Sequence, residues 1–435
     1  MQLSPGDRPG QPAKMMPDWW PGEIHDRFTD WAISQGVIVN GIAPARFPGR
    51  GLGMISTRAI EKGEAILTVP LKAMLTTRRI PMSFKRKFPK DISIHALLAA
   101  FLTLGDKEDL QKYELWRQTW PTRQDFEHSM PLLWPQSLRG PTPFYDDSAS
   151  EINLLPPSIS GAWNTLRKRK NEHDYETSHQ NLLAQQEQRL HKAWSSVISV
   201  FPDVDWETYS YNWLIVNTRS FYYLMPGQKP PEDRNDAMAL LPFADYFNHS
   251  DVEDDVKFDG QKYVFRATRR YNSGEEIYMS YGPHPNDFLL VEYGFYLEEN
   301  GSDAIYLDDI IFRDLSASLQ EELYLQQYYG NYEVTATGAC YRTEIAACLK
   351  YMTRRDWRNY ALGYSTKSFD AQKSNAIIQE WIRAYAKEAD TTIAALEALS
   401  PRKTDQEYTG KLSTLLRRWK QIRCLCDKAL EAVSC

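Results

Sequence analysis

The chain has 435 residues, 42% of them hydrophobic and 25% charged. These proportions are typical of globular proteins, and the length predicts two or three domains rather than one core. A formal net charge of −6 argues against nucleic acid as the main partner. No run approaches the roughly 20 apolar residues of a membrane span, and the first residues lack the apolar core of a secretory signal. We therefore expect a protein of the cytoplasm, the nucleus or both.

The first 90 residues predict a tail, a helix and strands. Residues 1–17 are rich in Pro, Gly, Gln and Lys, and we interpret them as a flexible N-terminal tail. Apolar spacing predicts a helix over residues 24–36 that the last residue, Gly36, ends. Apolar runs on both sides of Gly63-Glu64 predict a β-hairpin. The preceding Gly51-Leu52-Gly53 is either a tight turn or a place where a ligand approaches the backbone.

Residues 91–215 have helical and irregular patterns. Their large aromatic side chains, such as Trp116, Trp120 and Trp134, are expected in the core. The basic run Leu166-Arg167-Lys168-Arg169-Lys170 is either the solvated face of a helix or a nuclear-import signal.

Residues 240–295 mix polar side chains with apolar and aromatic sequence. Asp245, Asn248, His249 and Tyr281 are the polar members. A buried polar group costs free energy unless it finds partners, so the group is either a satisfied core network or a functional site.

The same segment predicts a second hairpin. Residues 263–268 alternate as a strand, residues 272–275 turn the chain, and residues 277–279 return it. We interpret the acidic loop at residues 251–255 as solvated, because it lacks the alternate ligand spacing of a calcium loop.

After residue 300 the composition favours a separate helical domain. Amphipathic spacing predicts helices around Trp381 and Trp419. All five cysteines lie here, and an odd number of them favours reduced thiols. Cys424 and Cys426 alone do not predict a metal site, because no second ligand pair lies nearby.

Three motifs in order carry a resemblance to a known family. They are Asn248-His249-Ser250, Tyr281-Gly282 and Glu292-Tyr293-Gly294-Phe295. Together with Gly51-x-Gly53 they resemble the SET-domain methyltransferases. More narrowly, the chain resembles the branch with the Rubisco large-subunit methyltransferase, ribosomal-protein lysine methyltransferases and actin-histidine methyltransferase.

This resemblance implies an α+β fold with short sheets around a knot-like active site. The expected parts are the tail (1–17), the N-terminal part of the SET domain (18–90), a helical insert (91–215), the C-terminal part of the SET domain (216–299) and an all-helical substrate-docking domain (300–435). S-adenosyl-L-methionine is the implied cofactor and a docked protein substrate the implied partner. We expect a monomer without a metal or a membrane partner.

The resemblance also assigns roles to single residues. The implied cofactor-binding residues are Leu52, Gly53, Arg219, Asn248, His249, Tyr281 and Phe295. Tyr281 matches the catalytic tyrosine as well. The implied substrate-channel residues are Phe221, Asp245 and Tyr293, although Asp245 could instead pair with a neighbouring arginine.

The function that follows is protein-lysine N-methylation of a non-histone protein, for which a ribosomal or translation-related protein is one candidate. Phe221 favours lysine, because the actin-histidine enzyme carries a polar residue there. The alternatives left open are a catalytically silent SET-fold binding module and a protein-histidine methyltransferase.

Overall fold

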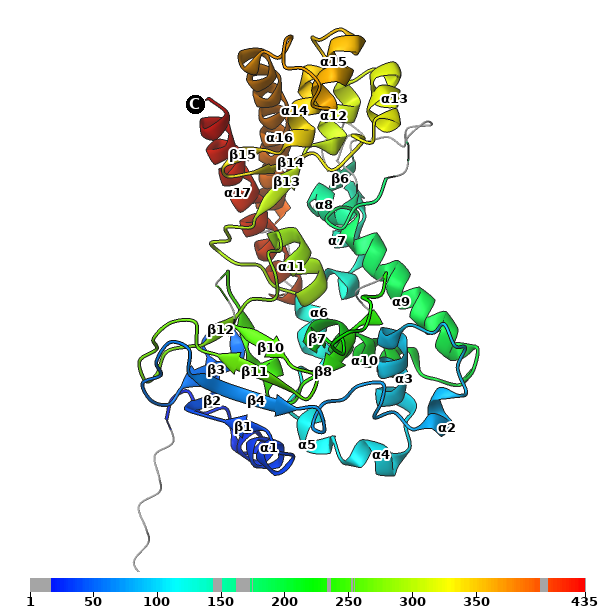
Figure 1. Ribbon diagram of the computed structural model, residues 1–435, viewed down its shortest axis with the longest axis vertical. Helices are drawn as coiled ribbons and strands as arrows, with labels where there is room; N and C mark the ends of the chain where they lie inside the picture. Colours follow the sequence, from blue (N-terminus) through cyan, green and yellow to red (C-terminus); the bar gives the residue numbers. More distant parts are fainter. Residues whose placement is uncertain are drawn as a thin grey trace, which may run out of the picture.

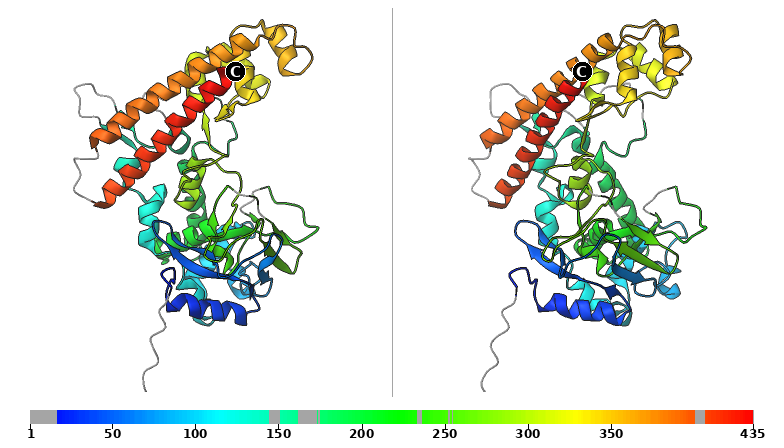
Figure 2. Two further views of the ribbon diagram at one scale, coloured as in Figure 1. Left: turned by 90° about the vertical axis from the view of Figure 1, so that its left-hand side faces the viewer. Right: turned by 60° about the vertical axis from the view of Figure 1, so that its left-hand side comes forward.

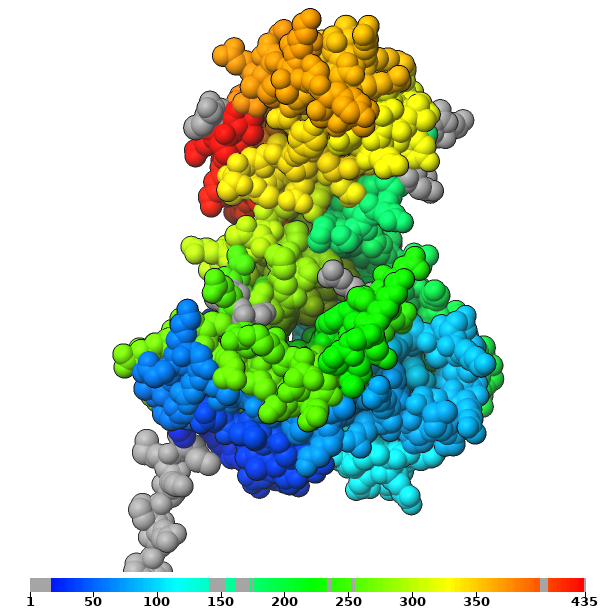
Figure 3. Space-filling model, viewed as in Figure 1, coloured from blue at the N-terminus to red at the C-terminus, as the bar shows by residue number. Residues whose placement is uncertain are grey.

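The computed structural model describes residues 17–143, 151–161, 173, 175–232, 236–251, 253, 255–399 and 406–434. The predicted tail up to residue 16, the whole basic run 166–170 and two residues of the acidic loop lie outside the described residues. Figure 1 shows a lower part with most of the strands and an upper part built mainly from helices. In the space-filling view of Figure 3, the two parts meet at a narrower waist.

The N-terminal region carries one longer helix and a series of strands. Its elements are α1 (Glu23–Ser34), β1 (Ile38–Val39), β2 (Ile42–Phe47), β3 (Gly51–Ser56), β4 (Ala65–Pro70) and α2 (Met82–Lys85). Helix α1 confirms the predicted helix. Gly36 follows it with φ 92°, and its N–H donates to the Ile33 carbonyl at 2.8 Å. Glycine tolerates this positive φ without strain.

The predicted hairpin at Gly63-Glu64 is wrong. Gly63 does turn the chain at φ 82°, but the strands on its two sides belong to different sheets. Strand β3 pairs with β2, whereas β4 pairs with β1 and β11 in a sheet of order β1-β4-β11-β10. A turn residue fixes a local reversal, while sheet partners are chosen by packing over the whole chain.

The predicted insert is helical, as expected. Its elements are α3 (Ile94–Leu104), α4 (Lys107–Gln111), α5 (Glu114–Arg117), α6 (Arg123–Ser129), η1 (Pro131–Leu133), α7 (Gln136–Arg139), β5 (Pro141–Pro143), β6 (Glu151–Asn153), α8 (Pro157–Ser160), α9 (Leu182–Ile198) and α10 (Trp206–Arg219). Trp116, Trp120 and Trp134 are buried, as predicted. The His95 ring of α3 stacks on Trp213 of α10, with centroids 4.3 Å apart. This packing fixes α10, whose last residue is Arg219.

Short strands, a 3-10 helix and an α-helix follow α10 in the described residues. They are β7 (Ser220–Tyr222), β8 (Met238–Leu240), η3 (Ala244–Tyr246), β9 (Asn248–His249), β10 (Val256–Phe258), β11 (Lys262–Arg266), β12 (Tyr278–Met279) and α11 (Asn286–Tyr293). The predicted strand at residues 263–268 is confirmed as β11. The hairpin expected after it is wrong, because β12 pairs in parallel with β9 and β11 pairs with β10 and β4.

The C-terminal region is mainly helical, as predicted. Its elements are β13 (Ala304–Tyr306), α12 (Asp308–Asp314), α13 (Ala317–Leu325), β14 (Glu333–Thr335), β15 (Gly338–Ala339), α14 (Tyr341–Cys348), α15 (Arg354–Ala361), α16 (Ala371–Leu399) and α17 (Gln406–Ser434). Helices α16 and α17 run side by side in both views of Figure 2. The small sheet β13-β14-β15 is an addition that the helical pattern does not predict, so this region is not all-helical.

A buried ion cluster ties α17 to the lower part. Arg418, fully buried, donates to Asp287 at the start of α11 (2.7 Å) and to Asp303 (2.7 Å and 3.0 Å). Among the described helices none is long and apolar enough to span a membrane. Within the same residues no three His, Cys, Asp or Glu side chains gather as metal ligands do.

Candidate active site

The site is built where two short strands meet from distant parts of the chain. β9 and β12 pair in parallel, with Asn248 opposite Tyr278 and His249 opposite Met279. Strand β3 lies against the same junction, since Ile55 bridges to Glu276. This arrangement brings residues 51–56, 248–249 and 276–281 together.

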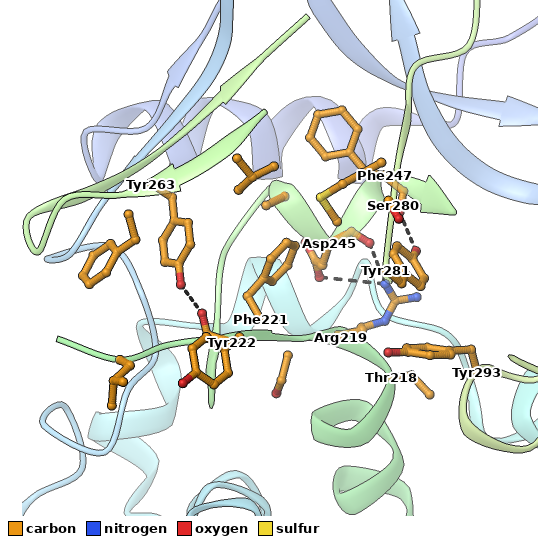
Figure 4. A pocket seen from close by; sticks show the side chains of 16 residues that line it. Thr218, Arg219, Phe221, Tyr222, Asp245, Phe247, Tyr263, Ser280, Tyr281 and Tyr293 are labelled. Carbon is orange, nitrogen blue, oxygen red and sulfur yellow. Dashed lines mark hydrogen bonds and ion pairs between the residues drawn. The ribbon is translucent and has the colours of Figure 1, made fainter. Parts of the chain in front are cut away.

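Two cavities adjoin at this junction. One has a volume of about 480 Å³ and the other about 170 Å³. Both are lined by Thr218, Arg219, Asp245, Tyr281 and Tyr293. Figure 4 shows Arg219 facing Asp245, with Tyr281 and Tyr293 beside it. Molecules in the two cavities would therefore meet at these five side chains.

The larger cavity has aromatic walls. Phe221 of β7 lines it, and its ring stands edge-on to Phe265, with centroids 5.9 Å apart. Further aromatic lining residues are Tyr222, Phe247, Phe258 and Tyr263. Such walls suit an aliphatic or aromatic side chain better than a hydrated charge.

The smaller cavity carries more polar groups for its size. Besides the shared residues it is lined by Leu52, Asn248, Phe295 and six residues of the insert and η3, namely Thr119, Pro121, Asp125, Phe126, Ser129 and Tyr246. Asn248 Nδ2 donates to the Leu52 carbonyl at 3.0 Å, which fixes strand β3 against β9. A Cβ at Gly53 would lie 2.6 Å from Asn248 Nδ2, so this close approach requires glycine.

Tyr281 lies at the centre of the junction. Its hydroxyl donates to the Phe247 carbonyl at 2.6 Å, and its backbone N–H donates to His249 Nδ1 at 3.0 Å. Burial raises the pKa of Tyr281 to about 12. The hydroxyl therefore keeps its proton at neutral pH.

His249 supports Tyr281 without lining either cavity. Its ring stacks on Tyr281 with centroids 5.0 Å apart. Burial lowers the pKa of His249. A neutral ring with an unprotonated Nδ1 is what the Tyr281 N–H requires.

Arg219 and Asp245 form the polar wall shared by both cavities. Arg219 Nη1 donates to the Asp245 carbonyl at 2.8 Å and lies 4.0 Å from its carboxylate. The carboxylate also accepts from Trp116 Nε1 at 2.9 Å, and burial raises the pKa of Asp245. Arg219 Nε is buried without a partner among the described residues. A guanidinium that lines a cavity fits the carboxylate of a bound ligand.

The structure thus gathers the ten residues singled out from the sequence, eight of them lining a cavity and two, Gly53 and His249, supporting those that do. Their individual roles stay predictions. Sequence reasoning missed the Phe247 carbonyl, a backbone group without a side-chain signal. It also missed Glu276, which accepts from Asn248 Nδ2 at 2.8 Å; its place one residue before the Ile277-Tyr278-Met279 run was the available signal.

Comparison with family models gives two matches that cover most of the chain. A model described as the SET domain matches residues 51–282, more than half of the 435 residues. A model described as the C-terminal domain of ribosomal lysine N-methyltransferase 2 matches residues 303–432.

Individual proteins are similar as well. Ribosomal lysine N-methyltransferase set11 of Schizosaccharomyces pombe is 29% identical over 249 residues, which cover 54% of this chain and 62% of that protein. SET domain-containing protein 4 of Homo sapiens is 25% identical, and the match covers 89% of this chain and 86% of that protein. Among solved structures, the crystal structure of the SET domain of LSMT bound to lysine and AdoHcy matches with a TM-score of 0.59 at 13% identity. The match covers 94% of this chain and 91% of that one. At that identity the likeness shows the fold alone.

Proposed function

The chain belongs to the SET-domain family, and on that premise we propose that it is an S-adenosylmethionine-dependent protein-lysine N-methyltransferase acting on a non-histone protein. The observation that carries the proposal is the pair of cavities that share Arg219, Asp245 and Tyr281. Transfer of a group between two molecules requires that their reacting atoms meet at one place.

The smaller cavity fits the cofactor. The Arg219 guanidinium, which lines this cavity, supports binding of its carboxylate, and Phe295 offers an aromatic wall for its adenine. Leu52 and Asn248 would hold its amino-acid end. When bound, S-adenosylmethionine supplies a methyl group on a positively charged sulfur.

The larger cavity fits the substrate side chain. Lysine has an unperturbed pKa of about 10.4, so only about one in a thousand is neutral at physiological pH, which costs about 4 kcal/mol. Removal from water between Phe221 and Tyr263, together with the positive charge of the cofactor sulfur, disfavours the charged ammonium. Both effects therefore lower the cost of presenting a neutral amine.

Tyr281 orients this amine. Because its own hydrogen is given to the Phe247 carbonyl, its oxygen is left to accept an N–H of the amine. The amine lone pair then points away from Tyr281. Since the pKa of Tyr281 is raised to about 12, it serves as an orienting group rather than as a base at neutral pH.

Lysine is proposed over histidine because of Phe221. Its ring packs against Phe265 and Tyr263 and offers no hydrogen bond to an imidazole. The substrate protein is proposed to dock on the C-terminal helical region, and a ribosomal or translation-related protein is the first candidate. A monomeric state and a cytoplasmic or nuclear location complete the proposal.

Equilibrium binding tests the proposal most cheaply. Titration with S-adenosylmethionine by calorimetry should give a single site with a dissociation constant in the micromolar range. Arg219→Met should raise this constant at least about tenfold, because it removes a charge-assisted contact. Absence of binding at high micromolar cofactor would leave a catalytically silent binding module instead.

A further inference from the structure

A buried carboxylate lies behind the cofactor cavity. Glu276, 9% exposed, uses both of its oxygens. Its Oε1 accepts from Asn248 Nδ2 at 2.8 Å. Its Oε2 accepts from the Tyr278 hydroxyl at 2.7 Å and pairs with Arg50 Nη2 at 2.7 Å. Glu276 thereby connects a cavity residue with Arg50, whose side chain is 56% exposed.

This contact settles which way the Asn248 amide faces. Asn248 Nδ2 has two hydrogens, and its two partners, the Leu52 carbonyl and the Glu276 carboxylate, can only accept. Both hydrogens are therefore used, and the amide oxygen must face the other way. Asn248 lines the smaller cavity, and no described residue donates to its Oδ1.

Gly53 makes room for this arrangement. A Cβ there would lie 2.6 Å from Asn248 Nδ2 and 2.8 Å from Glu276 Oε1. The absent side chain lets the carboxylate and the amide meet directly behind strand β3.

We propose that Glu276 is a positioning residue that holds the Asn248 oxygen toward the cofactor cavity, where it accepts a hydrogen bond from the α-ammonium group of the cofactor. Arg219, which lines the same cavity, meets the carboxylate of the same zwitterion. This inference rests on the proposed function, because it concerns the amino-acid end of S-adenosylmethionine.

The variant Glu276→Gln tests orientation rather than space. Arg50 can only donate, so the new amide turns its oxygen toward Arg50 and its NH₂ toward Asn248. Asn248 then loses a partner either way: with its NH₂ turned away from the cavity it faces the Gln NH₂, and with its oxygen turned that way it faces the Leu52 carbonyl, which can only accept. The Asn248 oxygen is therefore no longer held toward the cavity, and its hydrogen bond to the ammonium group weakens.

The readout is binding of two ligands that differ in one group. They are S-adenosylhomocysteine and its desamino analogue, which keeps the carboxylate and lacks only the amino group. Glu276→Gln should lower the affinity for S-adenosylhomocysteine at least about tenfold, as expected for a lost hydrogen bond to a charged group. The affinity for the desamino analogue should change by less than about threefold. Equal losses for both ligands would overturn the proposal, since they indicate general damage to the cavity.

A second variant separates orientation from lost charge. In Arg50→Met/Glu276→Gln, the Gln NH₂ can donate to the Tyr278 oxygen, so its own oxygen returns to Asn248 and affinity for S-adenosylhomocysteine should recover to within about threefold of wild type. No recovery would contradict the proposal.

If Glu276→Gln does not fold, a crystal structure of the wild-type protein with S-adenosylhomocysteine decides. It should show the α-amino nitrogen of the ligand within hydrogen-bond distance of Asn248 Oδ1, and an α-amino nitrogen without this contact refutes the proposal. A wild-type protein that binds neither ligand refutes the proposed function itself, whereas one that binds both equally refutes only this inference.

Discussion

The Tyr281 hydroxyl donates its hydrogen to the Phe247 carbonyl across 2.6 Å. The two residues come from segments 34 positions apart that meet where β9 pairs with β12. Because the hydrogen is already given away, the oxygen can only accept from a third group. Tyr281 lines the larger cavity, so under the proposed function its oxygen offers an acceptor to the incoming amine.

Replacing Tyr281 by Phe should reduce kcat at least about 100-fold, because the amine loses the group that aligns its lone pair. The dissociation constant for S-adenosylmethionine should stay within about threefold of wild type. Single-turnover methylation and calorimetry give the two values. Tyr209→Phe is the matched control, since that buried hydroxyl has no partner among the described residues. Wild-type turnover in Tyr281→Phe would contradict the role of Tyr281 in aligning the amine.

Gly53→Ala should weaken cofactor binding at least about fivefold. The added Cβ would lie under 3.0 Å from Asn248 Nδ2, Glu276 Oε1 and a Phe47 ring carbon, and such overpacking costs about 1–3 kcal/mol. Gly410→Ala is the control: it lies within α17 with nothing within 4 Å of the added carbon and should stabilise the helix by up to about 1 kcal/mol. Unchanged binding in Gly53→Ala would contradict the close contact.

Stability should fall on acidification because of His95. Burial lowers the pKa of His95 to about 3, below its unfolded value of about 6.5. The unfolded chain therefore binds a proton between these pH values while the folded chain does not, so stability is present above pH 6.5 and decreases as pH falls. From pH 7 to pH 5 this residue alone should remove about 2 kcal/mol.

The matched variant for that experiment is His95→Gln, which keeps a donor for the Trp213 carbonyl, 3.0 Å from His95 Nε2, and cannot titrate. Urea unfolding at several pH values should show a shallower decrease for the variant. Identical slopes for the two proteins would mean that His95 does not remain neutral in the fold.

Arg418→Met should destabilise the protein by about 3–5 kcal/mol, because it leaves Asp287 and Asp303 buried without their cation. Lys420→Met on the same helix is the control. Its ion pair with Glu397 is about half exposed and should contribute less than about 1 kcal/mol. Urea denaturation measures both, and equal effects would show that the cluster does not anchor α17.

Local patterns predicted the helices well and the strand partners poorly. Gly36 ends α1 as expected, because helix signals are carried by neighbouring residues. Gly63 and Gly274 both turn the chain at positive φ, yet the strands on either side do not pair with each other. Parallel pairing of β9 with β12 joins segments about 30 positions apart, and periodicity does not encode such a contact.

For the site, motif resemblance located the side chains and left out what orients them. Asn248, Tyr281 and Arg219 are recognisable by type and order along the chain. The carbonyls of Phe247 and Leu52 accept hydrogen bonds from Tyr281 and Asn248. Because a residue of any type supplies a backbone carbonyl, the sequence carries no signal for them. Glu276 is placed by the strand that follows it, but its contact with Asn248 becomes apparent only in the structure.

The most direct test of the central claim is methyl transfer itself. The protein is incubated with S-adenosylmethionine carrying a deuterated methyl group and a cell extract, and labelled residues are identified by mass spectrometry. The account predicts label on a lysine side-chain nitrogen of a non-histone protein with wild-type enzyme, and none with Tyr281→Phe. Label on histidine, or no label from a protein that binds the cofactor, would contradict it.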